Sequence, residues 1–125
     1  MDYLFVALGG ALGASARYSL THVPLLVGLE FPVGTLLVNV LGSLVIGIIA
    51  GVATRSKVFS HNATLFLKVG VCGGFTTFSS FSLEVFELYT QQKYVTASLY
   101  VAASVVGCII GVMLGDWVSR SLLGK

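Results

Sequence analysis

The most unusual segment of this 125-residue chain reads GGFTTFSSFS and covers residues 73–82. It brings glycines, hydroxyl side chains and phenylalanines together inside an otherwise apolar run. Lipid cannot hydrogen-bond a loose backbone, so irregular chain at membrane depth is tolerated only where protein or a watery cavity surrounds it. Adjacent glycines each weaken a helix by about 1 kcal/mol relative to alanine, and serine and threonine hydroxyls compete for backbone groups. We therefore predict a helix that breaks near Gly73–Thr77.

A break of this kind would expose backbone groups that can hold ions. The half-helix before it would end in free carbonyls, which suit a cation. The half-helix after it would begin with free amides, which suit an anion. We therefore expect the functional site at this segment, and we expect it to handle a small ion.

The composition is that of an integral membrane protein. Hydrophobic residues make up 56% of the chain and charged residues 10%, with a mean hydropathy of +0.97, whereas about a quarter of a soluble domain is charged. Crossing ~30 Å of hydrocarbon takes roughly 20 residues. The uncharged runs predict an all-α fold with four transmembrane helices, at residues 3–22, 33–53, 62–90 and 95–119. Short loops join them, so we expect one domain over residues 1–125.

The distribution of basic residues predicts the orientation of the chain in the membrane. Four crossings would place both termini on the same side of the membrane. Most basic residues flank that side: Arg55, Lys57, Arg120 and Lys125. Since cytoplasmic loops carry an excess of lysine and arginine, this bias favours cytoplasmic termini. The sequence begins Met-Asp-Tyr without a basic leader, so we expect the first helix to be kept rather than cleaved as a signal peptide.

Glycines recur at four-residue spacing in three of the predicted helices. They are Gly9 and Gly13, Gly47 and Gly51, and Gly107, Gly111 and Gly115. At this spacing glycines share one helix face and let neighbouring backbones approach closely, so we assign them to packing. The four helices of one chain bury little interior. Because small pores often form between subunits, we expect an oligomer.

Three phenylalanines, Phe75, Phe78 and Phe81, lie three residues apart across the predicted break. Membrane phenylalanines most often pack or face lipid, but here Ser79 and Ser80 are interleaved with the rings. An aromatic ring has a positive edge, which can contact an anion without a fixed charge that would trap it. A conduction path needs sites that bind an ion well enough to admit it and weakly enough to release it.

Polar residues form short stripes in the second and fourth predicted helices. Thr35 lies four residues before Asn39, and Tyr100, Ser104 and Cys108 follow one another at the same spacing. The Asn39 amide is both a donor and an acceptor. It could bond a neighbouring helix or donate to a dehydrated anion, and the stripe of hydroxyls could relay an ion or join helices. These alternatives stay open on the sequence alone.

Ionisable and thiol side chains inside the predicted helices need partners or a role. Arg17 should face protein or water because it is costly in lipid, and it could attract anions at a pore mouth or reach the interface. Glu84 and Glu87 could carry protons in a coupled transporter, although a salt bridge or a solvated helix end is commoner. Cys72 and Cys108 suit buried apolar roles.

We find no catalytic constellation, metal-ligand spacing or phosphate-binding loop, so we do not expect an enzyme.

Three blocks of sequence together resemble a known family. They read GGALGASARY at residues 9–18, GTLLVNVLG at residues 34–42 and GVCGGFTTFSSFS at residues 70–82. Their order and spacing, and the four-span length, are similar to the small bacterial fluoride channels, the CrcB or Fluc family. The third block is the most specific, and the resemblance covers essentially the whole chain.

The resemblance implies a function and an assembly. It implies a fluoride-selective channel in the cell membrane that exports fluoride passively and relieves its toxicity. It also implies an antiparallel dimer with two pores at its interface, formed by two copies of this chain or by this chain and an oppositely oriented homologue. The rivals are a proton- or sodium-coupled small-ion transporter that uses Glu84, and a non-conducting membrane scaffold.

The resemblance also implies roles for individual residues. The side chains expected at the pore and its fluoride are Asn39, Phe78, Phe81, Thr35, Ser79, Ser80, Tyr100 and Ser104. Arg17 is expected at the pore entrance. The backbone carbonyls of Gly73 and Thr76 are expected to hold a structural Na⁺ ion at the dimer interface. Cys108 departs from the family pattern, because it replaces a hydroxyl that can continue the polar stripe.

Overall fold

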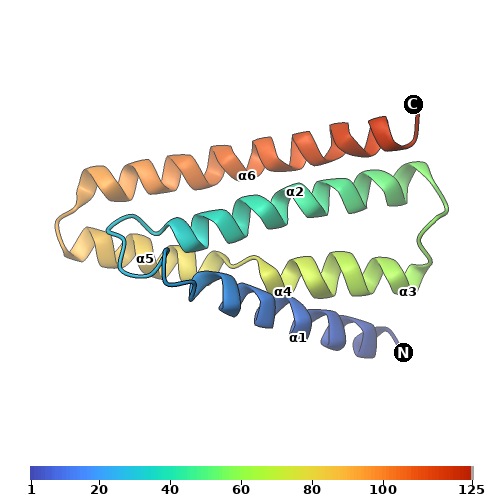
Figure 1. Cartoon of the computed structure of the whole chain (residues 1–125), viewed down its shortest axis with the longest axis horizontal. Coiled ribbons are helices and arrows are strands. Elements are labelled where there is room, and N and C mark those ends of the chain that lie inside the picture. The colour runs from blue at the N-terminus through green and yellow to red at the C-terminus, as the bar shows by residue number, and fades with distance from the viewer. Residues whose placement is uncertain (125) are drawn as a thin grey trace.

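The computed structural model describes residues 1–124, and the regular structure within them is helical. Its elements are α1 (Asp2–Thr21), α2 (Val33–Arg55), α3 (His61–Thr64), the π-helix η1 (Leu65–Cys72), α4 (Gly73–Phe75), α5 (Phe78–Thr90) and α6 (Tyr94–Leu122). Four of these follow one another along one interrupted helix, the interrupted rod of residues 61–90: α3, η1, α4 and α5. Both ends of the described chain lie at the same end of the molecule (Figure 1). The predicted four-helix, all-α architecture is therefore confirmed.

Three of the four long segments are long and apolar enough to cross a membrane: Val33–Arg55, His61–Thr90 and Tyr94–Leu122. The 20-residue α1 helix reaches the required length but falls outside this group. Its polar content explains this, because Arg17 and three serine or threonine residues lie in its second half.

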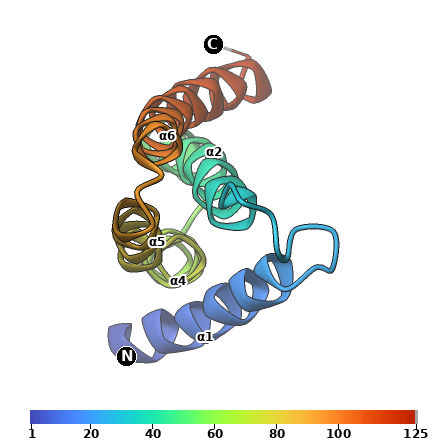
Figure 2. The same cartoon turned by 90° about the vertical axis from the view of Figure 1, so that its left-hand side faces the viewer.

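Helices α2 and α6 run side by side, and glycines make their contact close (Figure 2). A Cβ atom added to Gly115 would collide with the Leu44 carbonyl oxygen, and one added to Gly47 would collide with that of Val112. The predicted packing role of these glycines is confirmed.

Helix α1 crosses the first half of the interrupted rod and contacts η1 and α4. A Cβ atom on Gly13 would collide with the Val71 carbonyl oxygen, and one on Gly74 would lie 2.5 Å from the Gly10 carbonyl oxygen. The backbones of the two helices therefore meet closely here, which requires glycine at positions 13 and 74. Gly74 thus has a packing role that its place in the polar segment did not suggest.

The predicted break near Gly73–Thr77 is confirmed, but the glycine pair does not form it. Gly73 and Gly74 are both helical, and the chain becomes extended at Thr76 (φ −76°, ψ 156°) and Thr77 (φ −150°, ψ 116°). Helix α5 then begins at Phe78. Here the threonines interrupt the helix, because a threonine side chain can replace a helical backbone partner.

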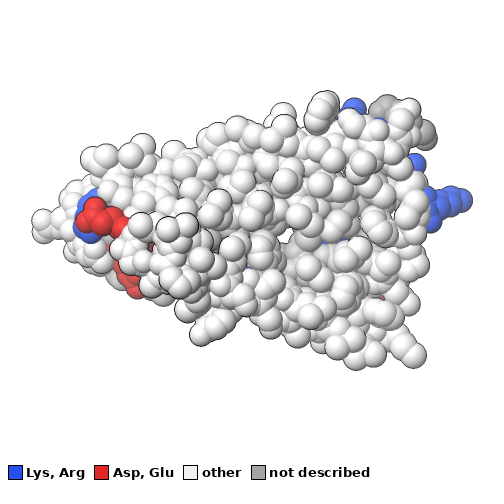
Figure 3. Space-filling view, in the orientation of Figure 1, with Lys and Arg blue, Asp and Glu red and all other residues white. Residues whose placement is uncertain are grey.

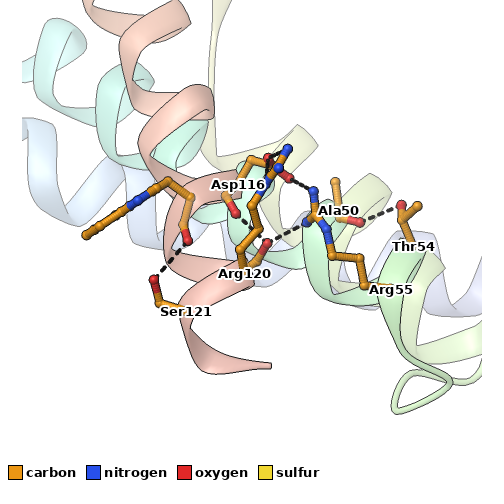
Figure 4. A network of polar contacts seen from close by, with 8 residues as sticks. Ala50, Thr54, Arg55, Asp116, Arg120 and Ser121 are labelled. Atoms are coloured by element: carbon orange, nitrogen blue, oxygen red, sulfur yellow. Dashed lines mark hydrogen bonds and ion pairs between the residues drawn. The ribbon is translucent and has the colours of Figure 1, made fainter. Parts of the chain in front are cut away.

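A polar cluster, the Arg55–Asp116 cluster, joins the ends of α2 and α6 near the termini (Figure 4). Arg55 Nη2 lies 2.6 Å from Asp116 Oδ1, and Arg120 Nη2 lies 2.9 Å from Asp116 Oδ2. Arg55 Nη1 also donates to Ser119 Oγ at 2.8 Å. On the face drawn in Figure 3, the charges at this end are basic, and acidic side chains appear at the opposite end. Lys125, part of the predicted basic bias, lies outside the described residues.

Candidate functional site

A pocket of about 440 Å³ opens beside the helix break, between α2, α5 and α6. It brings together four side chains predicted at the pore, namely Asn39, Phe78, Phe81 and Ser104, with both threonines of the break. The remaining lining residues are Ser43, Ile46, Val105, Cys108 and Ile109. Within the described chain this lining contains no charged side chain. The pocket is therefore a neutral chamber with amide, hydroxyl, thiol and aromatic groups on its walls.

Asn39 holds the break in place. Its Oδ1 accepts a hydrogen bond from the Thr77 backbone amide at 2.7 Å, and its Nδ2 donates to the Thr77 carbonyl oxygen at 3.0 Å. The Asn39 side chain thus supplies the hydrogen bonds that a continuous helix would have given to the Thr77 amide and carbonyl. Of the two roles that the sequence left open for Asn39, the structure shows the hydrogen bond to a neighbouring segment, and the role of donor to an anion stays a prediction. An amide nitrogen carries two hydrogens, so one donor stays available beside the pocket.

Phe78 and Phe81 form an aromatic pair at the start of α5. Their ring centroids lie 5.4 Å apart, with ring planes inclined by 46°. Phe81 is 8% exposed and also packs against Tyr100, with centroids 5.2 Å apart, whereas Phe78 is 78% exposed. The pair therefore has one ring anchored in the fold and one that the chain alone leaves uncovered.

Ser104 is the one buried side chain in residues 1–124 whose polar atom has no hydrogen-bond partner. It is 5% exposed, and it lines the pocket. An unpaired buried hydroxyl costs roughly 1–3 kcal/mol. A buried helix serine can avoid this cost by donating to the preceding turn, as Ser119 does to the Asp116 carbonyl oxygen. The Ser104 hydroxyl is therefore a polar group on the pocket wall that the rest of the described chain leaves without a partner.

Thr35 and Tyr100 belong to a second polar group, centred on Glu84. Thr35 Oγ1 donates to Glu84 Oε1 and the Tyr100 hydroxyl donates to Glu84 Oε2, both at 2.6 Å. Glu84 and Glu87 line another pocket, of about 430 Å³, at the end of the molecule opposite the termini. Neither of these two hydroxyls lines the neutral chamber, although the Tyr100 ring touches Phe81. Their expected place along the pore stays a prediction.

Ser79 and Ser80 take part in capping α5. The Thr77 hydroxyl oxygen accepts from the Ser80 backbone amide at 3.2 Å. It also lies 3.0 Å from Ser80 Oγ, to which it donates, and 3.3 Å from Ser79 Oγ. Neither serine lines the pocket. Their expected contact with fluoride stays a prediction.

The carbonyl groups of Gly73 and Thr76 fit the expected cation site. In a helix each would accept from the amide four residues later, which belongs to Thr77 or Ser80. Both amides are instead bonded to side chains, to Asn39 Oδ1 and Thr77 Oγ1. The break therefore releases both carbonyls, and a Cβ atom added to Gly73 would meet no atom within 4 Å.

Arg17 reaches the same break from α1. Its Nε donates to the Gly74 carbonyl oxygen at 3.2 Å, and the side chain is partly buried. A cation at the end of a helix also complements the negative end of the helix dipole. Arg17 therefore ties α1 to the end of α4, and it does not line the pocket. Its expected place at a pore entrance stays a prediction.

Ser43 is the polar lining residue that the sequence analysis missed. It lies four residues after Asn39, as Asn39 lies four residues after Thr35. Extending that spacing by one step would have found it. The hydroxyl partners of Glu84 gave no such signal, because they lie 49 and 16 residues away along the chain.

Comparison with known proteins gives a consistent result. The family model described as CrcB-like protein, Camphor Resistance (CrcB), matches residues 4–116. A protein of Rhodospirillum rubrum is 48% identical over 118 residues, with 92% of each chain covered. One of Geobacter sulfurreducens is 45% identical over 120 residues, covering 95% of this chain and 97% of the relative. One of Methylocella silvestris is 44% identical over 125 residues, covering 98% and 95%. Each of the three carries the name fluoride-specific ion channel FluC.

Proposed function

This chain belongs to the CrcB family, and we propose that it is a fluoride-specific ion channel in the cell membrane. Family membership over residues 4–116 carries the proposal, since the similar relatives bear that name. The neutral chamber beside the break supports it independently. The chamber offers neutral donors, and its lining within the described chain holds no charge that would retain an anion.

Fluoride is small and strongly hydrated, so a path for it must replace the lost water contacts with close donors. The remaining Asn39 hydrogen, the unpaired Ser104 hydroxyl and the ring edges of Phe78 and Phe81 are suitable donors in the chamber. Hydrogen bonds to a charged group are stronger than neutral ones, so a few neutral donors can offset much of the dehydration cost. Flux through such a path is passive, and it would lower cytoplasmic fluoride whenever the outside concentration is lower.

A second subunit would complete the site. Phe78 is 78% exposed in the isolated chain although it belongs to the chamber wall. A ring in that position suits an interface between subunits, and a two-fold axis would create two equivalent pores. The proposed assembly is an antiparallel dimer, either of two copies of this chain or with an oppositely oriented homologue. In it α1 would form the fourth membrane span of a single domain over residues 1–125.

A structural Na⁺ ion at the dimer interface is part of the proposal. Hard cations take oxygen ligands, and the carbonyls of Gly73 and Thr76 are released by the break. The Gly73 and Thr76 carbonyls of each subunit would hold the ion. Bound there, the ion would supply positive charge that offsets the carbonyl dipoles. Asn39 and Thr77 would keep these carbonyls available, because their side chains bond the Thr77 and Ser80 amides that the carbonyls would otherwise accept from.

Purified protein in liposomes tests the function. Vesicles loaded with potassium fluoride should release fluoride after valinomycin is added, and an imposed pH gradient should not drive accumulation. Accumulation driven by the gradient would favour a transporter in which Glu84 carries protons. Absence of any release would favour a non-conducting scaffold.

The assembly is tested separately. A cysteine placed at either terminus should be labelled from both sides of intact membranes if one chain adopts both orientations. Labelling from the cytoplasmic side alone would agree with the basic-residue bias and would require an oppositely oriented partner. Exchange of Na⁺ for K⁺ should promote dissociation into monomers, and an unchanged dimer would remove the ion from the proposal.

A further inference from the structure

Cys108 stands apart from the other cysteine of the chain. It lines the chamber beside the break and is partly exposed there, whereas Cys72 is 2% exposed and lies outside the chamber. Both thiols are free. The structure thus gives the two thiols very different access to a molecule in the chamber.

Ser104 adds an observation that itself points to a ligand. It lies one helical turn before Cys108 on α6, lines the same chamber and is 5% exposed. Its hydroxyl is the buried side-chain polar atom without a partner in residues 1–124. A buried hydroxyl in this state gains a hydrogen bond when a small polar molecule enters. The thiol is therefore in a space suited to receiving such a molecule.

The size and charge of the chamber define which molecules these are. Its volume is about 440 Å³, which is more than ten times the ~30 Å³ that one water occupies in the liquid. Within the described chain its lining is uncharged. Bringing a bulky charged reagent into it would cost free energy, because the few neutral donors that suit an ion as small as fluoride do not supply a paired charge for a larger group. Small, uncharged, thiol-reactive compounds are therefore favoured over charged ones.

We propose that Cys108 is a covalent modification site inside the conduction chamber, where small uncharged disulfide-forming compounds attach and obstruct fluoride. This inference rests on the proposed channel function. The adduct would project from α6 into the space shared by Ser104, Asn39 and the phenylalanine pair. Flux would then depend on the state of this thiol.

The probe is a neutral alkyl methanethiosulfonate. The Cys108 sulfur attacks the alkyl-bearing sulfur of the reagent and forms a new S–S bond. The bond to the sulfonyl group breaks, methanesulfinate leaves with the electron pair, and the thiol proton passes to water. A thiol reductant such as dithiothreitol reverses the change by disulfide exchange.

The experiment uses the full-length protein in liposomes, with the modified residue located by peptide mass spectrometry. Cys108 should be modified before Cys72. Fluoride efflux should fall in proportion to the modified fraction, more strongly for a benzyl than for a methyl reagent, and return after reduction. In Cys72→Ser the loss should persist. In Cys108→Ser the ratio of efflux after and before treatment should be one, whatever the untreated rate.

Other results would overturn the inference. Preferential modification of Cys72, or full modification of Cys108 with unchanged efflux, would each do so. Equal loss of efflux in Cys108→Ser would show that the reagent acts elsewhere. If untreated vesicles release no fluoride, the channel function fails together with the obstruction, and peptide mapping still decides whether Cys108 is the modification site.

Discussion

Two buried serines on α6 occupy opposite environments. Ser119 is fully buried in the Arg55–Asp116 cluster, where its hydroxyl accepts from Arg55 at 2.8 Å and donates to the Asp116 carbonyl at 2.6 Å. Ser104 is nearly as buried, at 5% exposed, and has no partner. Buried polar groups are almost always paired. The hydroxyl of Ser119 is therefore satisfied within the fold, whereas that of Ser104 stays available to the ligand that we propose for the chamber.

The two regions differ in charge in the same way. The cluster combines Arg55, Arg120 and Asp116, which satisfy one another through short ion pairs. The chamber, within the described chain, is lined by neutral groups alone. Fixed charges suit a permanent contact, because they bind strongly. Neutral donors suit an ion that must leave again. Substitutions in the cluster should therefore change stability, and substitutions in the chamber should change flux.

The largest effect is expected from the aromatic pair. Phe81→Ile and Phe78→Ile should each reduce fluoride efflux to background, because isoleucine has no ring edge to present to the anion. Efflux is measured with a fluoride electrode, and size-exclusion chromatography checks that the protein stays assembled. Phe86→Ile is the matched control, since Phe86 lies on the same helix, is exposed and is not part of the chamber. Normal efflux in both chamber variants would remove the rings from the mechanism.

Asn39 should affect both flux and stability, because it belongs to the chamber and also holds the break. Asn39→Ala deprives the Thr77 amide and carbonyl of their partners, which should lower stability by roughly 1–3 kcal/mol and abolish efflux. Asn39→Asp keeps an acceptor for the amide but places a carboxylate beside the anion path. It should lose efflux with a smaller loss of stability, measured by thermal unfolding in detergent. An Asp variant that conducts normally would limit Asn39 to packing.

The two serines test the comparison directly. Ser104→Ala removes an unpaired hydroxyl, so stability should be unchanged or rise by up to about 1 kcal/mol, while efflux falls. Ser119→Ala removes two hydrogen bonds, so stability should fall by about 1 kcal/mol, while efflux stays normal. The same two assays, efflux and thermal unfolding, are applied to both. The proposed difference between the two serines is wrong if both variants lose only stability, or if both lose only efflux.

Local composition was enough to predict the break, because threonines and serines beside glycines disfavour a continuous helix wherever they occur. It could not tell which residues form the break. Gly74 is helical and packs against the Gly10 backbone, where a side chain would collide, and that contact depends on where α1 crosses. The break falls instead at Thr76 and Thr77.

The candidate site was predictable as a list of residues but not as a geometry. Spacing put Asn39 and Ser104 on polar faces, and the chamber does contain both. The same reasoning grouped Thr35 and Tyr100 with them, whereas their hydroxyls bind Glu84. Position along a helix fixes a face, but the choice between neighbouring acceptors on that face depends on the relative positions of α2, α5 and α6. The π-helical turns of η1 had no recognisable sequence signal either.

The smallest effects on efflux are expected from the two arginines of the cluster, whose substitutions should change stability alone. Arg120 is 58% exposed and pairs with Asp116 one turn away on the same helix, so Arg120→Ala should cost about 0.3–0.5 kcal/mol. Arg55 is 24% exposed and joins α2 to α6 through both Asp116 and Ser119, so Arg55→Ala should cost roughly 1–3 kcal/mol.

Neither arginine variant should change the efflux rate per folded protein, since the cluster and the chamber share no residue. Thermal unfolding measures the two costs, and a double variant with Asp116→Asn should show coupling that is larger for Arg55 than for Arg120. Equal coupling would mean that the link between helices adds nothing beyond a local ion pair. A loss of efflux in Arg55→Ala at full folding would mean that the position of α6 at the cluster sets the shape of the chamber. Stability and conduction would then depend on a shared element, and the division between the two regions would have to be abandoned.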